Sequence, residues 1–367
     1  MSRHDGALGL SVSGLTKVFG ERPALREVTI AVDPGTFLVL LGPSGSGKTT
    51  LLRCLAGIER PTSGEIVIGD RVVAGPRTFV APERRGLAMV FQDYALWPHL
   101  TVRQNVGFSL HSSTLPRPER ARRVDGLLER VGISSLASSY PNQLSGGEQQ
   151  RVALARALAA EAGVILFDEP LSNLDADRRE QLRVEIATLV RGIGATAVYI
   201  THDQSEAFAL ADRVGVLHGG RLVQIDTPEG VYHRPASAFV ARFTGVAGEF
   251  PVDRVRPCGE GRCEVALPFA PGERITALEP AALAAGAELA LFVRSAGVSL
   301  TCAEDRRGVA AQVLDVAFNG RGYEHVVSVG PGATLSRVFA ERRFDRASAV
   351  RVVLDPRSCF VMDRTGG

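Results

Sequence analysis

The chain has 367 residues, which is too long for one compact domain of ordinary size, so two or three domains are expected. Apolar residues make up 45% and charged residues 22%, the composition of a globular protein with enough apolar material for real cores. Forty-two basic residues against forty acidic ones give a net charge of +2, which offers no basic face for nucleic acid.

Membrane insertion is not expected from this sequence. The longest apolar candidate, residues 281–293, is shorter than the roughly eighteen residues that span a bilayer and carries Glu288. Residues 1–13 lack a basic region followed by an apolar one, so no signal peptide is expected. The five cysteines are scattered, and Cys258 and Cys263 have no second pair or nearby histidine to complete a zinc site. Reduced thiols in the cytoplasm are the simpler interpretation.

Strand and helix patterns alternate through the first two thirds of the chain. Strands are expected at 8–12, 28–32, 37–41, 87–91, 164–167, 197–200 and 214–217, with a pair of strands near 64–73. Helices are expected at 50–56, 124–131, 146–160, 175–191 and 204–211. Residues 101–160 are mainly helical and interrupt the alternation, so they are interpreted as an insert. Strands that alternate with helices predict a mostly parallel sheet.

The pattern changes from about residue 245. Short alternating runs, separated by Gly and Pro, lie at 264–267, 288–293, 309–316, 325–329 and 350–354. Such runs are typical of a small all-β domain or barrel. Basic and acidic residues balance in this part of the chain, which argues against a DNA-binding module.

A glycine-rich loop follows the apolar strand expected at 37–41. It fits the pattern G-x4-G-K-[ST] and reads Gly42, Pro43, Ser44, Gly45, Ser46, Gly47, Lys48, Thr49, Thr50. Glycines let backbone N–H groups approach phosphate oxygens, and the following helix adds its positive end. Lys48 supplies charge for the β and γ phosphates, and the Thr49 hydroxyl is a ligand for Mg²⁺.

A chance Gly/Ser-rich loop is the alternative interpretation. Composition argues against it, because every basic residue except Lys17 and Lys48 is an arginine, and a planar guanidinium would not fit a tight loop. The loop alone indicates only a nucleoside triphosphate, since kinases and GTPases share it.

Two further segments carry chemistry. The strand expected at 164–167 ends in Asp168, which can hold Mg²⁺ through water, and Glu169, which can polarise the attacking water as a general base. An ordinary strand-to-loop exit is the alternative. A helix expected after Ser145 begins in a serine and two glycines, which makes an anion-binding N-terminus or simply a capped helix. That segment reads Leu144, Ser145, Gly146, Gly147, Glu148, Gln149, Gln150, Arg151.

This octapeptide, downstream of such a loop, resembles the signature motif of ABC ATPases. The resemblance implies an α/β P-loop ABC cassette over 1–240, with a helical insert at about 95–160. A β-rich regulatory domain of OB-like, TOBE type is implied over 241–367. ATP and Mg²⁺ are the implied cofactors, and the implied activity is ATP hydrolysis coupled to transport.

The resemblance also implies roles for single residues. Gln92 matches the Q-loop glutamine, which senses Mg²⁺ and the attacking water. Thr49, Gln92 and Asp168 are the implied ligands of Mg²⁺. Asp175, in Ser172–Asp175, matches the D-loop at the dimer seam. His202 matches the switch histidine that contacts the γ-phosphate, although a lone histidine after a strand is more often structural. Phe19 stands where the family usually has an aromatic residue, most often tyrosine, that stacks on adenine.

Two subunits of the family pack head to tail. Each ATP is therefore implied to lie between the glycine-rich loop of one chain and the signature residues of the other, Ser145, Gly146, Gly147 and Glu148. Residues 93–108, the segment after His202 and the β-rich tail resemble bacterial importer subunits. Trp97, the only tryptophan, is either a core residue or an interface anchor for a membrane subunit.

The importer resemblance implies a homodimer with two integral-membrane permease subunits and a solute-binding protein, at the cytoplasmic face of the bacterial inner membrane. Ferric iron is the expected solute, with polyamine, sulfate, phosphonate and sugar as alternatives. A soluble ABC protein that acts on ribosomes or DNA is the alternative of another class. It predicts two fused cassettes or a coiled-coil insert, with basic surfaces, and the sequence displays none of these.

Overall fold

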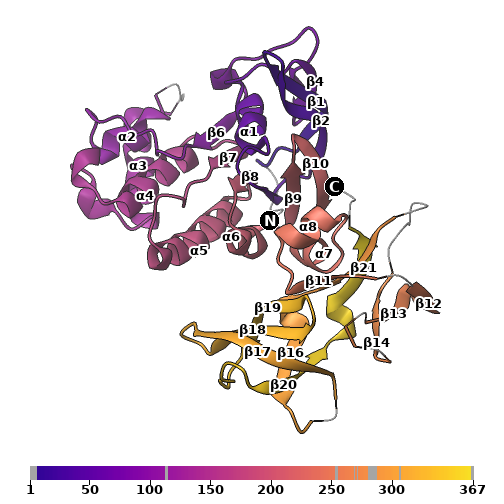
Figure 1. Ribbon diagram of the computed structural model, residues 1–367. Helices are drawn as coiled ribbons and strands as arrows, with labels where there is room; N and C mark the ends of the chain where they lie inside the picture. The colour runs from indigo at the N-terminus through magenta and orange to yellow at the C-terminus, as the bar shows by residue number, and fades with distance from the viewer. Residues whose placement is uncertain are drawn as a thin grey trace. The chain divides into compact units, whose positions relative to one another are not determined.

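The computed structural model describes residues 6–111, 115–252, 255–267, 269–270, 272–279, 287–305 and 307–364 (Figure 1). Residues 1–5, and 281–286 of the apolar run noted above, lie outside these ranges. Within them, no helix is both long enough and apolar enough to cross a membrane. The chain divides into two compact units, Met1–Glu229 and Gly230–Gly367.

Two sheets form the N-terminal unit. The larger one has the order β10-β9-β3-β8-β7-β6 and is parallel except for β10, so the predicted mostly parallel sheet is confirmed. The smaller one is antiparallel, with the order β2-β1-β4-β5. The strands are β1 (Leu10–Phe19), β2 (Arg22–Val32), β3 (Phe37–Leu41), β4 (Ser63–Ile68), β5 (Arg71–Ala74), β6 (Leu87–Val90), β7 (Val164–Asp168), β8 (Thr196–Thr201), β9 (Arg213–His218) and β10 (Arg221–Asp226).

The helices of this unit lie at the predicted places, with two differences: α3 begins at Arg117, before the predicted 124, and α2 is an addition. They are α1 (Lys48–Ala56), α2 (Val102–Phe108), α3 (Arg117–Arg130), α4 (Gly146–Ala159), α5 (Ala176–Ile193) and α6 (Gln204–Leu210). Helix α2 was not predicted individually, because it is short and buries only Val102, Asn105 and Val106. In Figure 1, α2, α3 and α4 lie together at one end of the unit, and α1 lies beside the sheets.

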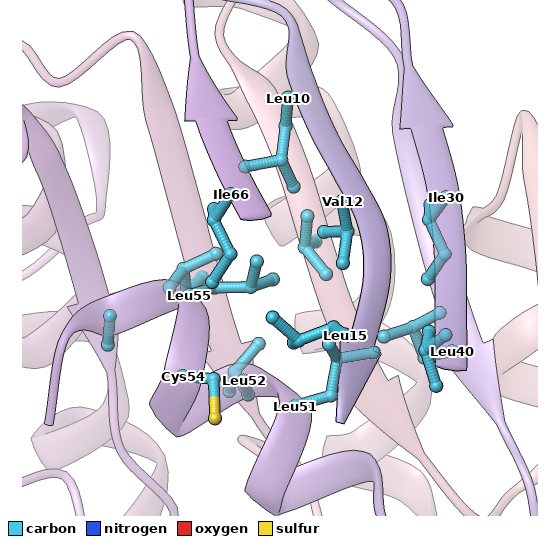
Figure 2. Close-up of a cluster of buried hydrophobic side chains, with 14 of the residues drawn as sticks. Leu10, Val12, Leu15, Ile30, Leu40, Leu51, Leu52, Cys54, Leu55 and Ile66 are labelled. Carbon is cyan, nitrogen blue, oxygen red and sulfur yellow. The ribbon is translucent and has the colours of Figure 1, made fainter. Parts of the chain in front are cut away.

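The core of the unit fixes α1 between the two sheets. Leucines of α1 meet side chains from β1, β3 and β4 in one buried cluster (Figure 2). The labelled members are Leu10, Val12, Leu15, Ile30, Leu40, Leu51, Leu52, Cys54, Leu55 and Ile66. Each large apolar side chain buried here stabilises the fold by about 1.5–3 kcal/mol. The loop at 42–47, which joins β3 to α1, is therefore anchored at both ends.

The C-terminal unit is built mainly from two sheets around a shared apolar core, as the alternating runs predicted. Their orders are β11-β15-β21-β14-β13-β12 and β16-β20-β17-β18-β19, and all pairs are antiparallel except β14 with β21. The strands are β11 (Gly248–Pro251), β12 (Val255–Gly259), β13 (Arg262–Ala266), β14 (Arg274–Leu278), β15 (Leu289–Val293), β16 (Val298–Cys302), β17 (Val309–Phe318), β18 (Tyr323–Gly330), β19 (Ala333–Ala340), β20 (Ala349–Leu354) and β21 (Cys359–Asp363). Two short helices, α7 (Pro228–His233) and α8 (Ala238–Phe243), precede them.

Arg294, which directly follows β15, is an ion buried within this unit. It is only 1% exposed and donates hydrogen bonds to the carbonyl oxygens of Tyr232, Ala241 and Gly245. Its guanidinium also lies 4.3 Å from the centroid of the Tyr232 ring, and burial lowers the pKa of Arg294 to about 10. The arginine thereby ties α7 and α8 to the sheets that follow them.

Candidate nucleotide site

The parallel pairing of β3, β8 and β7 brings three separate sequence segments to one edge of the sheet. Leu41 pairs with Thr201, and Asp168 pairs with Ile200. Gly42, Glu169 and His202 therefore leave the sheet at the same edge, since the carboxyl ends of neighbouring parallel strands coincide. The sequence placed these residues in three motifs far apart along the chain, and the sheet gathers them.

The glycine-rich loop requires glycine at its ends for steric reasons. A Cβ on Gly42 would lie 2.3 Å from the carbonyl oxygen of Leu217, and one on Gly47 would lie 2.6 Å from that of Ala24. Gly47 also has φ 105°, a conformation that other residues adopt only with strain. Gly45 has φ 77° and open space around its Cα, so the middle of the loop faces outward while its ends are packed.

Lys48 lies beneath this loop. Its side chain is 5% exposed, and Nζ donates hydrogen bonds to the carbonyl oxygens of Gly42 at 2.7 Å and Pro43 at 3.1 Å. Burial lowers the pKa of Lys48, while Glu169 and Asp168 act in the opposite direction. The Ser46 hydroxyl is buried without a hydrogen-bond partner in the described part of the chain. A buried cation and an unpaired hydroxyl in one loop suit an anionic ligand.

The two carboxylates at the end of β7 differ in environment. Asp168 is buried, and burial raises its pKa, with Arg53 opposing the shift. Glu169 adopts φ 43° and donates its N–H to the carbonyl oxygen of Ile200 at 3.2 Å. His202 Nδ1 lies 3.0 Å from Glu169 Oε2. A strained glutamate paired to a histidine beside a buried lysine is the arrangement expected of a reactive site.

A hydrogen-bonded bridge joins the Gln92 segment to the Glu169 segment. Gln92 Nε2 donates to Ser172 Oγ at 3.3 Å, and Ser172 Oγ donates to the carbonyl oxygen of Glu169 at 2.9 Å. Asn173 Nδ2 donates to the carbonyl oxygen of Gln92 at 3.0 Å. Asp175 caps α5 by accepting from the N–H of Arg178, so its carboxylate is engaged within its own chain.

A carboxylate of the same helix, that of Glu148, lies at the N-terminus of α4. Glu148 Oε2 accepts hydrogen bonds from the Ser145 N–H at 2.7 Å and from Ser145 Oγ at 2.8 Å, and these bonds lower the pKa of Glu148. The predicted N-cap at Ser145 is confirmed. A cavity of about 400 Å³ adjoins this turn and is lined in part by Arg151 and Arg178. None of the hydrogen bonds and ion pairs described for this chain joins 145–148 to 42–49.

Two aromatic side chains from the sequence predictions are exposed. Phe19 is 47% exposed, and Lys17 Nζ lies 4.6 Å from the centroid of its ring. Trp97 is 43% exposed and packs against the exposed ring of Phe108 at 5.5 Å between centroids. The interpretation of Trp97 as a core residue is therefore wrong. The pairing of Phe108 with Trp97 was not predicted. Phe108 is the last residue of the short helix α2, and no sequence pattern of that length shows which face of a helix is exposed.

Sequence reasoning also missed two buried polar residues that lie outside the motifs, Glu206 and Asn105. Glu206 is buried and accepts hydrogen bonds from the Tyr199 hydroxyl at 2.9 Å and from Thr201 Oγ1 at 2.8 Å. Asn105 is fully buried, accepts from the Trp97 N–H and donates to the carbonyl oxygen of Trp97. No local pattern distinguishes these residues from solvent-exposed polar residues, since their partners come from the fold.

Comparison with known proteins agrees with this geometry. A family model described as ABC transporter matches residues 25–172. An Fe(3+) ions import ATP-binding protein FbpC of Rhizobium etli is 41% identical over 326 residues, which cover 88% of each chain. The chain therefore belongs to the ATP-binding proteins of the ABC transporter family, and the fold expected from the signature resemblance, an ABC cassette followed by a β-rich region, is confirmed.

Other relatives match over a shorter length. An sn-glycerol-3-phosphate import ATP-binding protein UgpC of Rhizobium meliloti is 53% identical over 226 residues, 62% of this chain and 64% of that protein. The chain thus spans less than two thirds of that relative. A sulfate/thiosulfate import ATP-binding protein CysA of Mycobacterium bovis is 49% identical, over 67% of this chain and 69% of its own.

Solved structures also resemble part of this chain. The ATP-binding cassette MJ0796, described as a dimeric post-hydrolysis state bound to ADP and Pi, is 32% identical with a TM-score of 0.53. That match covers 60% of this chain and 98% of MJ0796.

Proposed function

We propose that this chain hydrolyses ATP and that the hydrolysis powers solute import through a membrane complex. The observation that carries the proposal is the meeting of Lys48, Asp168, Glu169 and His202 at one sheet edge, with His202 and Glu169 3.0 Å apart. The membership of the ABC transporter family and the import names of its relatives support it.

The triphosphate binds along the glycine-rich loop, where backbone N–H groups after Pro43 and at the start of α1 face it. Lys48 exchanges its bonds to the Gly42 and Pro43 carbonyls for phosphate oxygens, which a charged ammonium favours. Ser44, Ser46, Thr49 and Thr50 add hydroxyl donors. Phe19 offers the exposed ring on which a base can stack once Lys17 moves aside.

Hydroxyl, amide and carboxylate oxygens, which the residues of this site offer, are ligands that Mg²⁺ prefers. Thr49, Gln92 and Asp168 would hold it, and the buried Asp168 carboxylate in particular gains a counter-charge that offsets its desolvation. When bound, Mg²⁺ neutralises charge on the β and γ phosphates.

Glu169 is the general base. It accepts a proton from the attacking water, and its strained backbone, together with His202, fixes the direction of the carboxylate. His202 also contacts the γ-phosphate with the ring nitrogen that does not face Glu169. Gln92 is coupled to Glu169 by two hydrogen bonds: Gln92 donates to the Ser172 hydroxyl, and that hydroxyl donates to the Glu169 carbonyl.

A second copy of the chain completes the site. Ser145, Gly146, Gly147 and Glu148 of one copy face the ATP held by the other, and Asp175 lies at the seam between them. The support is twofold. Among the described residues, no hydrogen bond or ion pair joins 145–148 to the glycine-rich loop of the same chain. The solved relative MJ0796 is described as dimeric.

The exposed Trp97 and Phe108 rings are the docking surface for a permease subunit. Aromatic side chains enriched at interface centres supply much of the binding free energy of such contacts. The partners are accordingly two permeases and a solute-binding protein, and the chain works at the cytoplasmic face of the membrane. The part of the C-terminal unit from residue 241 onward is the regulatory domain. The proposed domain limits remain 1–240 and 241–367, with the insert at about 95–160.

Ferric iron is the proposed solute. The supporting observation is the length of the match: the Fe(3+) import relative matches over 88% of this chain, including most of the β-rich unit, whereas the glycerol-phosphate and sulfate relatives match over 62% and 67%. Uptake of radiolabelled ferric iron, sulfate and glycerol 3-phosphate by cells that lack this chain separates the candidates. Loss of sulfate or glycerol 3-phosphate uptake with normal iron uptake refutes the assignment.

A steady-state ATPase assay of the full chain tests the catalytic roles. Glu169→Gln is expected to abolish turnover while nucleotide still binds, and Lys48→Ala is expected to lose both binding and turnover. Ser145→Arg is expected to leave binding to the monomer intact and to prevent ATP-dependent dimerisation in a Glu169→Gln background, measured by light scattering. Unchanged turnover in Glu169→Gln, or normal dimerisation with Ser145→Arg, contradicts the model.

A further inference from the structure

The backbone between Gln92 and Trp97 is strained. Tyr94 has φ 63° and Ala95 has φ 45°, so two successive non-glycine residues adopt the left-handed conformation. Each such residue is unfavourable by itself and persists only where surrounding contacts hold it. The turn lies between Gln92, the glutamine assigned to the nucleotide site, and the exposed Trp97.

Arg156 of α4 supplies the contacts that hold this turn. Its Nη1 donates to the carbonyl oxygen of Ala95 at 2.6 Å, and its Nη2 donates to that of Tyr94 at 2.8 Å. The planar fork of the guanidinium thus engages both strained residues through two separate nitrogens, in a fixed geometry that the single ammonium of a lysine does not reproduce. Burial lowers the pKa of Arg156, and Asp93 of the same loop acts in the opposite direction.

The turn also contacts the start of α4. Tyr94 is 5% exposed, and its hydroxyl has no hydrogen-bond partner among the described residues. That hydroxyl lies 3.9 Å from where a Cβ on Gly146 would stand, and Leu174 lies at 3.5 Å from the same point. A single helix, α4, therefore carries both the Gly146 turn and the arginine that holds the loop of Gln92.

We propose that Arg156 is a positioning residue that keeps the Tyr94–Ala95 turn left-handed and thereby fixes Gln92 relative to the signature turn. The proposal rests on the proposed function, because the effect is felt where Gln92 meets Mg²⁺ and the attacking water. If the turn relaxes, the backbone that carries Gln92 moves, and only the fraction of molecules with the turn in place binds the metal productively.

The test compares Arg156→Lys, Ala95→Gly and the double variant in the full chain. The readouts are the Mg²⁺ concentration at half-maximal ATP hydrolysis and the melting temperature. Arg156→Lys keeps the charge and loses the planar two-nitrogen fork, and it is expected to raise the half-saturating Mg²⁺ concentration by about tenfold. Ala95→Gly is expected to behave like the wild type, because glycine adopts the left-handed conformation without strain.

The double variant is the decisive one. Glycine at position 95 lowers the intrinsic cost of the turn, so it should bring the half-saturating Mg²⁺ concentration most of the way back to the wild-type value. Should the double variant be no better than Arg156→Lys, or should Arg156→Lys leave Mg²⁺ dependence unchanged, the proposal is wrong. If Arg156→Lys does not fold, the proposal still requires Ala95→Gly to rescue soluble, Mg²⁺-dependent activity.

Arg294→Lys is the control, since Arg294 is more deeply buried than Arg156 and likewise donates to backbone carbonyls through its guanidinium. It is expected to lower the melting temperature and to leave the half-saturating Mg²⁺ concentration unchanged. An equal shift in both arginine variants would mean a general loss of stability and would overturn the proposal. Failure of the proposed function is recognised separately, because wild type and Lys48→Ala would then hydrolyse ATP equally.

Discussion

Replacing Glu206 tests whether the polar groups buried next to His202 stabilise the fold. Glu206 is 4% exposed, and it is the acceptor for two hydroxyls that are themselves buried, those of Tyr199 (0% exposed) and Thr201 (3% exposed). The Thr201 oxygen also accepts the Asp203 N–H at 3.0 Å, so this network surrounds the backbone of His202 on both sides.

The expected loss of stability follows from this geometry. Glu206→Leu leaves two buried hydroxyls without their acceptor, at a cost of about 1–3 kcal/mol each. The variant also removes a carboxylate that burial destabilises, which offsets part of that cost. A net loss of about 2–4 kcal/mol is expected, or a fall in melting temperature of about 4–16 °C for a unit of this size. Glu206→Gln keeps an acceptor oxygen and should stay within about 1 kcal/mol of the wild type.

The contribution of Glu206 to stability depends on pH in a definite direction. Burial raises the pKa of Glu206 above its ordinary value of 4.5, so the folded chain holds this proton more tightly than the unfolded chain does. The stabilisation from that proton is complete below about pH 4.5 and is lost as the pH rises through the folded-state pKa. The melting temperature of Glu206→Gln relative to wild type should therefore increase from pH 4.5 upward.

Differential scanning calorimetry of the three proteins at several pH values measures both effects. A Glu206→Leu variant as stable as wild type would refute the role of the buried acceptor. A difference between Glu206→Gln and wild type that is constant with pH, or that decreases as the pH rises, would refute the assignment of a raised pKa to this carboxyl group.

Three further changes have defined outcomes. Gly47→Ala forces a Cβ to within 2.6 Å of the Ala24 oxygen at φ 105°, so nucleotide affinity measured by calorimetry should fall at least about tenfold; unchanged affinity contradicts the packing of this loop. Asn105→Ala removes the hydrogen bonds that hold the Trp97 backbone, so it should destabilise the chain by about 2–4 kcal/mol and lower the fluorescence anisotropy of Trp97. A variant of unchanged stability and unchanged anisotropy contradicts the role of Asn105 in holding Trp97. Arg294→Met should destabilise the C-terminal unit by about 1–4 kcal/mol in urea titration, because three buried or partly buried carbonyls lose their donor. An unchanged midpoint would show that Arg294 is dispensable for stability.

The sequence by itself determined the glycine-rich loop, the strand that precedes it and the helix that follows. Each is encoded locally: an apolar run for a strand buried on both faces, glycines where the backbone turns, and a helical pattern after them. The same holds for Asp168 and Glu169 at the end of β7, and for the cap of α4 at Ser145, where serine and Glu148 are three residues apart.

Only the tertiary structure decided which of these segments meet, and which polar residues are buried. The contact of His202 with Glu169 depends on the pairing of β7 with β8, and the exposure of Trp97 depends on how the helices at 102–159 pack. The role of Arg156 also depends on the fold, because in the sequence it looks like any other arginine of a helix. Only the structure shows that it donates hydrogen bonds to the Tyr94–Ala95 turn. The physical reason is that these hydrogen bonds and this burial join residues far apart in the chain, and local propensity contains no information about such partners.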